Sequence, residues 1–196
     1  MRALVTGGAG FIGSNLVDEL IKQGHDVIVI DNESASENEK FYWNNKAENH
    51  KLDICDYDKI ESLFEGIDWV FHLAAQSRIQ PAIENPIRTV RVNCEGTTNI
   101  LQAARKHKVK KVMYSSTSSY YGLKNDIPAK EDMQRDCLNP YSMSKWMGEQ
   151  VCKLYSQLYE IPTIVLRYFN VYGPREPIKG EYAPVIGLFK RQNKNG

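Results

Sequence analysis

Tyr141 and Lys145 stand four positions apart and are the first candidates for chemistry in this sequence. Asn139 and Pro140 come just before them and predict a helix start, because asparagine caps a helix and proline suits its first turn. Residues four apart on a helix lie on one face. A free tyrosine titrates at about 10, and a neighbouring ammonium favours the phenolate. The two side chains are therefore predicted to act together as a base and its supporting cation.

Hydroxyl side chains precede that helix, in the run Ser115 to Ser119. They follow a predicted central strand, so one of them could share a substrate proton with the phenol. The tyrosine–lysine spacing alone decides nothing, because it recurs at Tyr42/Lys46 and at Tyr120/Lys124. What favours Tyr141 is its place on a capped helix after the hydroxyl run.

A glycine-rich turn, Gly7-Gly8-Ala9-Gly10-Phe11-Ile12-Gly13, follows a short apolar segment at the start of the chain. Glycine enters the left-handed backbone region without steric cost, so Gly7 and Gly8 permit a tight strand-to-helix turn. Gly10 would let the backbone approach a diphosphate, and Gly13 would let the helix lie against the strand. The free N–H groups of that helix start would face the phosphates. The turn predicts a dinucleotide site.

Asp31 ends the second apolar segment, about 20 positions past the glycines, where a carboxylate accepts both hydroxyls of a ribose. The same charge would repel a 2′-phosphate, and no arginine follows closely, so the sequence favours NAD over NADP. The roles of two further polar residues stay open. Asp53 could accept from the adenine amino group or could be a solvated loop acid. Asn93 could hold loops against the cofactor or could be purely structural.

Apolar segments alternate with helical patterns along the whole chain, which predicts an α/β fold. We expect a Rossmann-type doubly wound parallel sheet with helices on both faces and strand order 3-2-1-4-5-6. The expected strands are 2–6, 26–30, 50–52, 69–73, 111–115 and 162–167. The expected helices are 11–21, 56–64, 86–107 and 140–158, with a short helix anchored by Tyr42 and Trp43 and a last one from about Pro184.

Composition sets limits on the partners. Hydrophobic residues make up 42% and charged residues 25%, with a formal net charge of +1. These values favour neither a nucleic acid nor an anionic membrane. No apolar run approaches the roughly 20 residues that cross a bilayer, and no signal peptide is recognised, so we expect a cytoplasmic protein. The four cysteines and four histidines lack metal-type spacing, and no metal site is predicted.

Seven stretches together resemble the extended short-chain dehydrogenase/reductase family, and within it the UDP-glucose and UDP-N-acetylglucosamine 4-epimerases. They are VTGGAGFIGSNLVDEL, VID, HLAAQ, NCEGTTNIL, YSSTSSYYG, NPYSMSK and LRYFNVYGPR. The resemblance implies NAD as a tightly held cofactor and a UDP-hexose as substrate. It implies a C4 inversion through a transient 4-keto sugar, with Tyr141 taking the proton of the 4-hydroxyl.

The resemblance also implies roles for individual residues. The catalytic residues would be Thr117, Tyr141 and Lys145. The cofactor contacts would be Gly7, Gly10, Phe11, Ile12, Gly13, Asp31, Asn32, Asp53, Ile54, Leu73, Ala74, Ala75, Gln76, Asn93, Ser115, Tyr141, Lys145 and Tyr168. The substrate contacts would be Ser116, Thr117, Tyr141 and Asn170.

Two departures from the family pattern keep alternatives open. Ser118 and Ser119 stand where related 4,6-dehydratases and decarboxylases carry acids, so elimination chemistry is less favoured, although another NAD-dependent nucleotide-sugar enzyme remains an alternative. Family members run well beyond this length, so we expect a cofactor domain over 1–174 and the start of a shortened substrate lobe over 175–196. The alternative is a binding module without turnover. Its exposed apolar residues would bind a partner; they are Val185, Ile186, Leu188 and Phe189. The resemblance implies a homodimer through helices near 90–106 and 141–158.

Overall fold

The structure, a computed structural model, describes residues 1–35, 38, 40–177, 189 and 192–193. Six parallel strands form one sheet in the order β3-β2-β1-β4-β5-β6. The strands are β1 (Arg2–Thr6), β2 (Asp26–Asp31), β3 (Glu48–Lys51), β4 (Trp69–His72), β5 (Lys111–Thr117) and β6 (Thr163–Tyr168). The predicted Rossmann-type doubly wound sheet and its strand order are confirmed.

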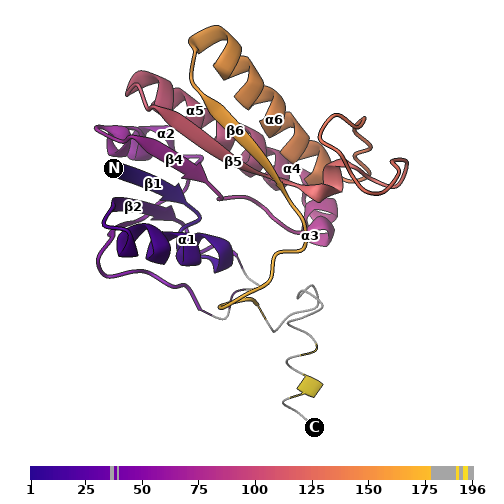
Figure 1. Cartoon of the computed structure of the whole chain (residues 1–196), viewed down its shortest axis with the longest axis horizontal. Coiled ribbons are helices and arrows are strands. Elements are labelled where there is room, and N and C mark those ends of the chain that lie inside the picture. Colours follow the sequence, from indigo (N-terminus) through magenta and orange to yellow (C-terminus); the bar gives the residue numbers. More distant parts are fainter. Residues whose placement is uncertain (36–37, 39, 178–188, 190–191, 194–196) are drawn as a thin grey trace.

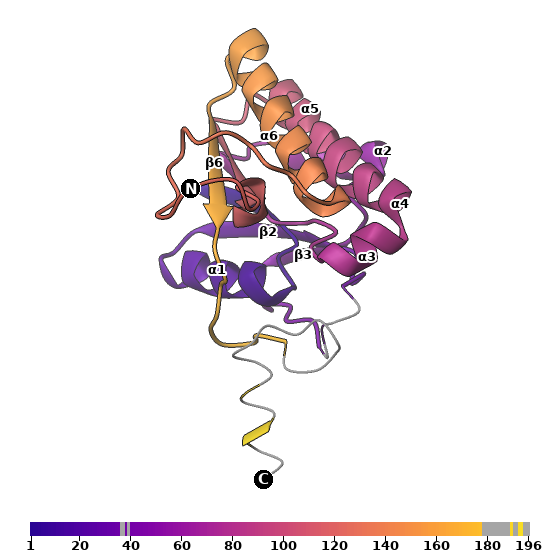
Figure 2. The ribbon, with the colours of Figure 1, turned by 90° about the vertical axis from the view of Figure 1, so that its right-hand side faces the viewer.

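Helices cover both faces of this sheet (Figures 1 and 2). The helical elements are α1 (Phe11–Lys22), α2 (Tyr57–Ile60), η1 (Glu61–Phe64), α3 (Ile79–Glu84), α4 (Pro86–Val90), η2 (Arg91–Gly96), α5 (Thr97–Lys106), η3 (Ser118–Tyr120) and α6 (Pro140–Tyr159). Helix α1 lies on one face, and α5 and α6 lie together on the other. The long helical stretch predicted over 86–107 is one continuous path through α4, η2 and α5.

The core divides into two layers because successive side chains of a strand point to opposite faces. In β1, Leu4 packs with Ile28 of β2 and Val112 of β5 in the layer under α5 and α6. Its neighbours Ala3 and Val5 pack instead in the layer under α1. Both faces of the central strands are therefore buried, which explains why these strands are apolar throughout.

Helix α6 begins where the sequence predicts it. The side chain of Asn139 accepts from the backbone N–H of Ser142 at 2.9 Å, the Ser142 hydroxyl faces the Asn139 backbone in return, and Pro140 occupies the first turn. This reciprocal cap satisfies donors that a helix start leaves free. It fixes the first turn of α6, which carries Tyr141.

One expectation about local structure was wrong, and one strand begins at a different residue than predicted. Tyr42 and Trp43 form no helix: the Tyr42 N–H donates to the carbonyl of Ala9 at 2.8 Å, and the Trp43 indole donates to Glu33 at 2.8 Å. These contacts hold the segment against the glycine turn. The third strand begins earlier than predicted, at Glu48. The helix expected from about Pro184 falls largely outside the described residues.

Strand β5 extends two residues past its predicted end. Ser116 and Thr117 pair with Arg167 and Tyr168 of β6, so the first part of the hydroxyl run belongs to the sheet. Threonine is β-branched and suits a strand, and pairing with β6 overrides the loop preference of serine. The extension carries the hydroxyl groups to the carboxyl edge of the sheet, beside α6.

Candidate active site

A cavity of about 990 Å³ lies along the carboxyl ends of the strands, the edge at which doubly wound sheets bind their ligands. Its lining includes both the glycine turn and the tyrosine–lysine pair. The predicted site residues that line it are Gly7, Gly10, Phe11, Ile12, Gly13, Asp31, Asn32, Asp53, Ile54, Leu73, Ala74, Ala75, Ser115, Ser116, Thr117, Tyr141, Lys145, Tyr168 and Asn170. One continuous cavity thus brings together features from six strand ends.

The glycine turn is shaped by close backbone approach. Gly7 has a φ of +69°, and a Cβ there would lie 2.8 Å from the backbone N of Ala74. A Cβ on Gly13 would lie 2.1 Å from the Gly7 carbonyl oxygen, so the helix packs directly on the turn. The expectation that Gly8 is left-handed was wrong. Gly8 is needed because a Cβ would meet Val29 at 2.6 Å.

This turn fits a diphosphate. The helix that follows it, α1, begins at Phe11 with no side chain capping its first N–H groups. Gly10 lines the cavity, and a Cβ there would meet nothing closer than 3.4 Å. Uncapped N–H groups at a helix start attract anions. The cradle is therefore open on the side that a dinucleotide phosphate would occupy.

Asp31 and Asp53 also line the cavity. Asp31 accepts from the N–H of Ala9 at 3.1 Å and of Glu33 at 2.8 Å. Burial is the largest influence and raises the pKa of Asp31 above its usual value, while these hydrogen bonds oppose the rise. Asp53 accepts from the side chain of Asn32 at 2.9 Å. Asn32 therefore links the two predicted cofactor carboxylates along one wall.

Asn93 and Gln76 do not line the cavity; they brace its wall from behind. The Asn93 side chain accepts from the Gln76 N–H at 2.8 Å and donates to the Gln76 carbonyl at 3.1 Å. It also donates to the Ser144 hydroxyl of α6 at 2.9 Å. Asn93 lies in η2, a turn of π-helix, and such turns often mark functional sites. This geometry supports the loop-holding hypothesis for Asn93.

A buried histidine, His72, joins the two halves of the site, although the sequence analysis assigns it no role. The Ala74 N–H donates to the Thr6 hydroxyl at 3.2 Å, and that hydroxyl lies 2.7 Å from Nδ1 of His72. His72 Nε2 lies 2.9 Å from the Thr97 hydroxyl, which donates to the Asn93 carbonyl at 2.7 Å. This chain assigns the proton to Nε2. Burial lowers the pKa of His72 to about 3, so the ring stays neutral.

Tyr141 and Lys145 lie on one face of α6, as predicted, and both line the cavity. The phenol is hydrogen-bonded to the side chain of Thr117. Burial raises the pKa of Tyr141 above its usual value, and the hydrogen bond from Thr117 and the charge of Arg78 oppose that rise. Burial also lowers the pKa of Lys145 to about 8. The ammonium of Lys145 lies 4.5 Å from the centre of the Tyr114 ring.

A second cation acts on the phenol besides the predicted Lys145. The charge of Arg78 lowers the pKa of Tyr141, against the larger effect of burial. Arg78 lies just before α3 and lines the cavity. Sequence reasoning missed it because nothing in its own segment places it opposite α6. The two rival tyrosine–lysine spacings lie outside regular α-helix and carry no comparable arrangement.

The fold and this cavity define a class: a Rossmann-type dinucleotide-binding domain with a tyrosine–lysine pair beside a hydroxyl-bearing strand end. The comparison with protein families agrees. The NAD dependent epimerase/dehydratase family matches residues 3–196, and the chain belongs to that family.

Individual relatives give more detail. A UDP-N-acetyl-alpha-D-glucosaminuronate decarboxylase of Bacillus cytotoxicus is 38% identical over 211 aligned residues, covering all of this chain and 62% of the relative. The UDP-glucose 4-epimerase of Thermotoga maritima, solved with UDP-glucose, is 37% identical with a TM-score of 0.92, over 98% of this chain and 62% of that one. The UDP-glucose 4-epimerase of Thermus thermophilus, solved with NAD, is 36% identical with a TM-score of 0.85, over 92% and 59%.

The chain spans about three fifths of the length of the curated relatives it matches. Its relatives include more than one activity, so family membership alone leaves the reaction open. Among the described residues, no helix is long and apolar enough to cross a membrane. The same residues contain no cluster of three or more potential metal ligands.

Proposed function

We propose that this chain carries the cofactor domain and catalytic residues of an epimerase that inverts C4 of a UDP-hexose. The observation that carries the proposal is the contact between the Tyr141 phenol and the Thr117 hydroxyl on the wall of the cavity that also holds the glycine turn. A sugar hydroxyl placed against these two groups could give its proton to Tyr141. The similarity to UDP-glucose 4-epimerases supports this reaction.

Each residue has a role in that reaction. Bound NAD⁺ would supply the hydride acceptor at C4 and a positive ring near the phenol. Tyr141 would remove the proton of the 4-hydroxyl, and Thr117 would bridge the phenol and that oxygen. Lys145, buried and cationic at neutral pH, would hold the nicotinamide ribose. Asp31 would accept from the adenosine ribose, and Asn170 would contact the substrate.

The wall beside Thr117 favours inversion over elimination. Ser118 and Ser119 line the cavity where related dehydratases and decarboxylases carry acids. A hydroxyl with an ordinary pKa cannot serve as a general acid for loss of water at neutral pH. Inversion needs no such acid, because its only proton transfer is at the 4-oxygen.

Proton NMR tests the proposal directly. UDP-glucose and UDP-N-acetylglucosamine are incubated together with the chain and NAD, and the anomeric region is followed. We expect the matching galacto signals to appear and to identify the preferred sugar. Silence in both, with NAD recovered from the denatured protein, would contradict turnover by this chain and would support the second candidate.

The second candidate is a dinucleotide-binding module without turnover of its own. Two facts favour it: the chain spans about three fifths of its relatives' length, and the outer face of β6 is open within the described residues. Ile164 and Leu166 on that face are 40% and 39% exposed. Such a module would bind NAD yet leave both UDP-sugars unchanged.

We also propose a homodimer through the helices on the α6 face. Apolar side chains are exposed there on α4 and α6, among them Ile87, Met143, Met147 and Leu154, and the two helices pack together. Contiguous exposed apolar surface marks association sites. Light scattering should give a dimer mass, and Met147→Glu should shift it to the monomer. A monomeric wild type at micromolar concentration would refute the interface.

A further inference from the structure

A largely buried ion pair lies one helical turn beyond the catalytic lysine. Glu149 of α6 accepts from Arg167 of β6 through both carboxylate oxygens, with Nε to Oε1 at 3.0 Å and Nη2 to Oε2 at 2.9 Å. The side chains are 7% and 18% exposed. A two-point contact of this kind fixes orientation as well as distance. The pair therefore locks α6 to β6 in a defined register.

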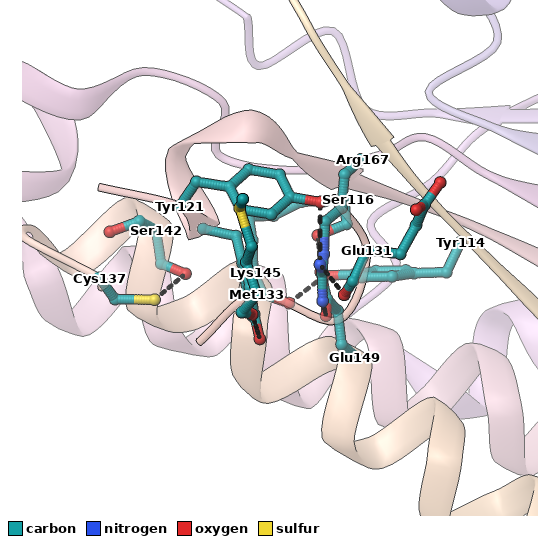
Figure 3. Close-up of polar contacts among 11 residues, drawn as sticks. Tyr114, Ser116, Tyr121, Glu131, Met133, Cys137, Ser142, Lys145, Glu149 and Arg167 are labelled. Carbon is teal, nitrogen blue, oxygen red and sulfur yellow. Dashed lines mark hydrogen bonds and ion pairs between the residues drawn. The ribbon is translucent and has the colours of Figure 1, made fainter. Parts of the chain in front are cut away.

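Glu149 extends the catalytic row of α6. Tyr141, Lys145 and Glu149 follow one another at intervals of four, so they lie along one face of the helix. The Ser116 hydroxyl donates to the Glu149 carboxylate. Ser116 precedes Thr117, the residue whose side chain meets the Tyr141 phenol. Figure 3 shows Ser116, Glu149 and Arg167 together above α6. Glu149 thus holds the strand end that presents Thr117.

Arg167 also contacts the segment that follows the cavity-lining residues Ser118 and Ser119. Its Nη1 donates to the Tyr121 hydroxyl at 3.1 Å and to the Glu131 carbonyl at 3.1 Å. The guanidinium also lies 3.4 Å from the centre of the Tyr120 ring. These contacts come from the long polar segment 118–137, which connects β5 to α6. A single arginine therefore ties that segment to the same carboxylate that holds Ser116 (Figure 3).

We propose that Glu149 and Arg167 are positioning residues, which hold Thr117 opposite Tyr141 and fix segment 118–137, whose first residues Ser118 and Ser119 form part of the cavity wall. The catalytic part of this proposal rests on the proposed function; the structural part does not. Burying an ion pair gains little stability over apolar packing, so such pairs are better suited to specifying geometry. Small displacements of reacting groups cost large factors in rate, and neither residue needs to touch the substrate for this effect.

Glu149 also acts on Lys145 through charge. The carboxylate raises the pKa of Lys145, against the larger effect of burial. The titratable groups facing Lys145 are Tyr141, Glu149 and Cys152 of α6, Cys94 of η2, His72 of β4 and Tyr114 of β5. Because Glu149 raises the pKa of Lys145, its loss would let Lys145 give up its proton at lower pH.

The first test needs no turnover. Glu149→Gln and Arg167→Lys are compared with wild type and with Glu61→Gln, which breaks an ion pair with Lys106 away from the cavity. Lysine keeps the charge but cannot reproduce the fork. Hydrogen exchange followed by mass spectrometry should show peptides from 118–137 exchanging about tenfold faster in Arg167→Lys than in wild type. Unchanged exchange there, with NAD still bound, would overturn the wall assignment.

The second test measures epimerisation. Glu149→Gln should lower kcat by about tenfold or more with KM within about threefold, and the alkaline limb of its kcat profile should move down by about one pH unit. An unchanged profile with unchanged kcat would refute the role of Glu149. If wild type shows no turnover, the proposed function fails. The exchange result still tests whether Arg167 fixes segment 118–137. If Arg167→Lys does not fold, Glu149→Gln/Arg167→Gln retains a neutral hydrogen-bonding pair and takes its place.

Discussion

The glycine turn and the catalytic wall face one cavity but are built differently. The turn, residues 7–13, is defined by backbone atoms: the carbonyl of Gly7 lies where a Cβ of Gly13 would be, and Gly7 itself meets the backbone of Ala74. The catalytic wall is defined by side chains: Ser116, Glu149 and Arg167 are joined through hydrogen bonds and charge, and Thr117 follows Ser116 and meets Tyr141.

This difference predicts two kinds of fragility. Steric repulsion rises steeply over a few tenths of an ångström, so the turn should tolerate almost no added volume. Hydrogen bonds and charges act over longer distances and depend on protonation, so the wall should respond to pH and to isosteric changes. Substitutions that change one property at a time can separate these behaviours.

Tyr141→Phe should have the largest effect. It removes one oxygen from the wall and leaves the turn untouched, so epimerisation should fall by about 10² to 10⁴-fold, the usual weight of a general base. Cofactor content, measured by releasing NAD from the denatured protein, should stay unchanged. Tyr42→Phe is the matched control, because Tyr42 has the same spacing to a lysine but does not line the cavity. Near-normal turnover of Tyr141→Phe would show that another group is the base.

Gly13→Ala should disrupt the glycine turn and leave the catalytic wall unchanged. Its methyl group would lie 2.1 Å from the Gly7 carbonyl oxygen, which is a backbone atom and cannot move aside. We expect the free energy of unfolding to fall by about 3 kcal/mol or more, measured by urea denaturation.

Gly10→Ala is the control for this change. Its Cβ would meet nothing closer than 3.4 Å, so stability should hold. Because Gly10 lines the cavity, NAD binding measured by calorimetry should still weaken by about tenfold. Equal stability loss in both variants would contradict the steric account.

The same contrast explains what the sequence could predict. The turn, Asp31 and the cap at Asn139 are local patterns, so their residues specify the geometry within one segment. The strand order followed from alternation and handedness. His72, Arg78 and Arg167 could not be found this way, because their partners lie on other elements, many positions away.

The buried, neutral His72 should make the stability of the protein depend on pH. Its pKa is about 3 in the fold and about 6.5 in an unfolded chain. The unfolded state therefore binds the extra proton first, and stability falls as pH drops from 6.5 toward 3, by up to about 1.4 kcal/mol per pH unit. His72→Gln should be less stable at pH 7 and should lack this part of the slope in denaturation measured at several pH values. His25→Gln, at a partly exposed position outside the core, should keep the full slope.

Asp31→Ala should have the smallest effect. It tests a residue that contacts the backbone of the turn and would also recognise the cofactor through its side chain. The carboxylate accepts from the turn through the Ala9 N–H but would recognise the ribose as a side chain. Its loss should weaken NAD by about tenfold and narrow the preference over NADP, because a charge that repels the 2′-phosphate is gone. Competitive binding of the two cofactors measures both effects. Asp53→Asn is the control, since a change at the proposed adenine contact should weaken NAD and NADP alike. An unchanged ratio in Asp31→Ala would assign the choice of cofactor to the shape of the turn rather than to this charge.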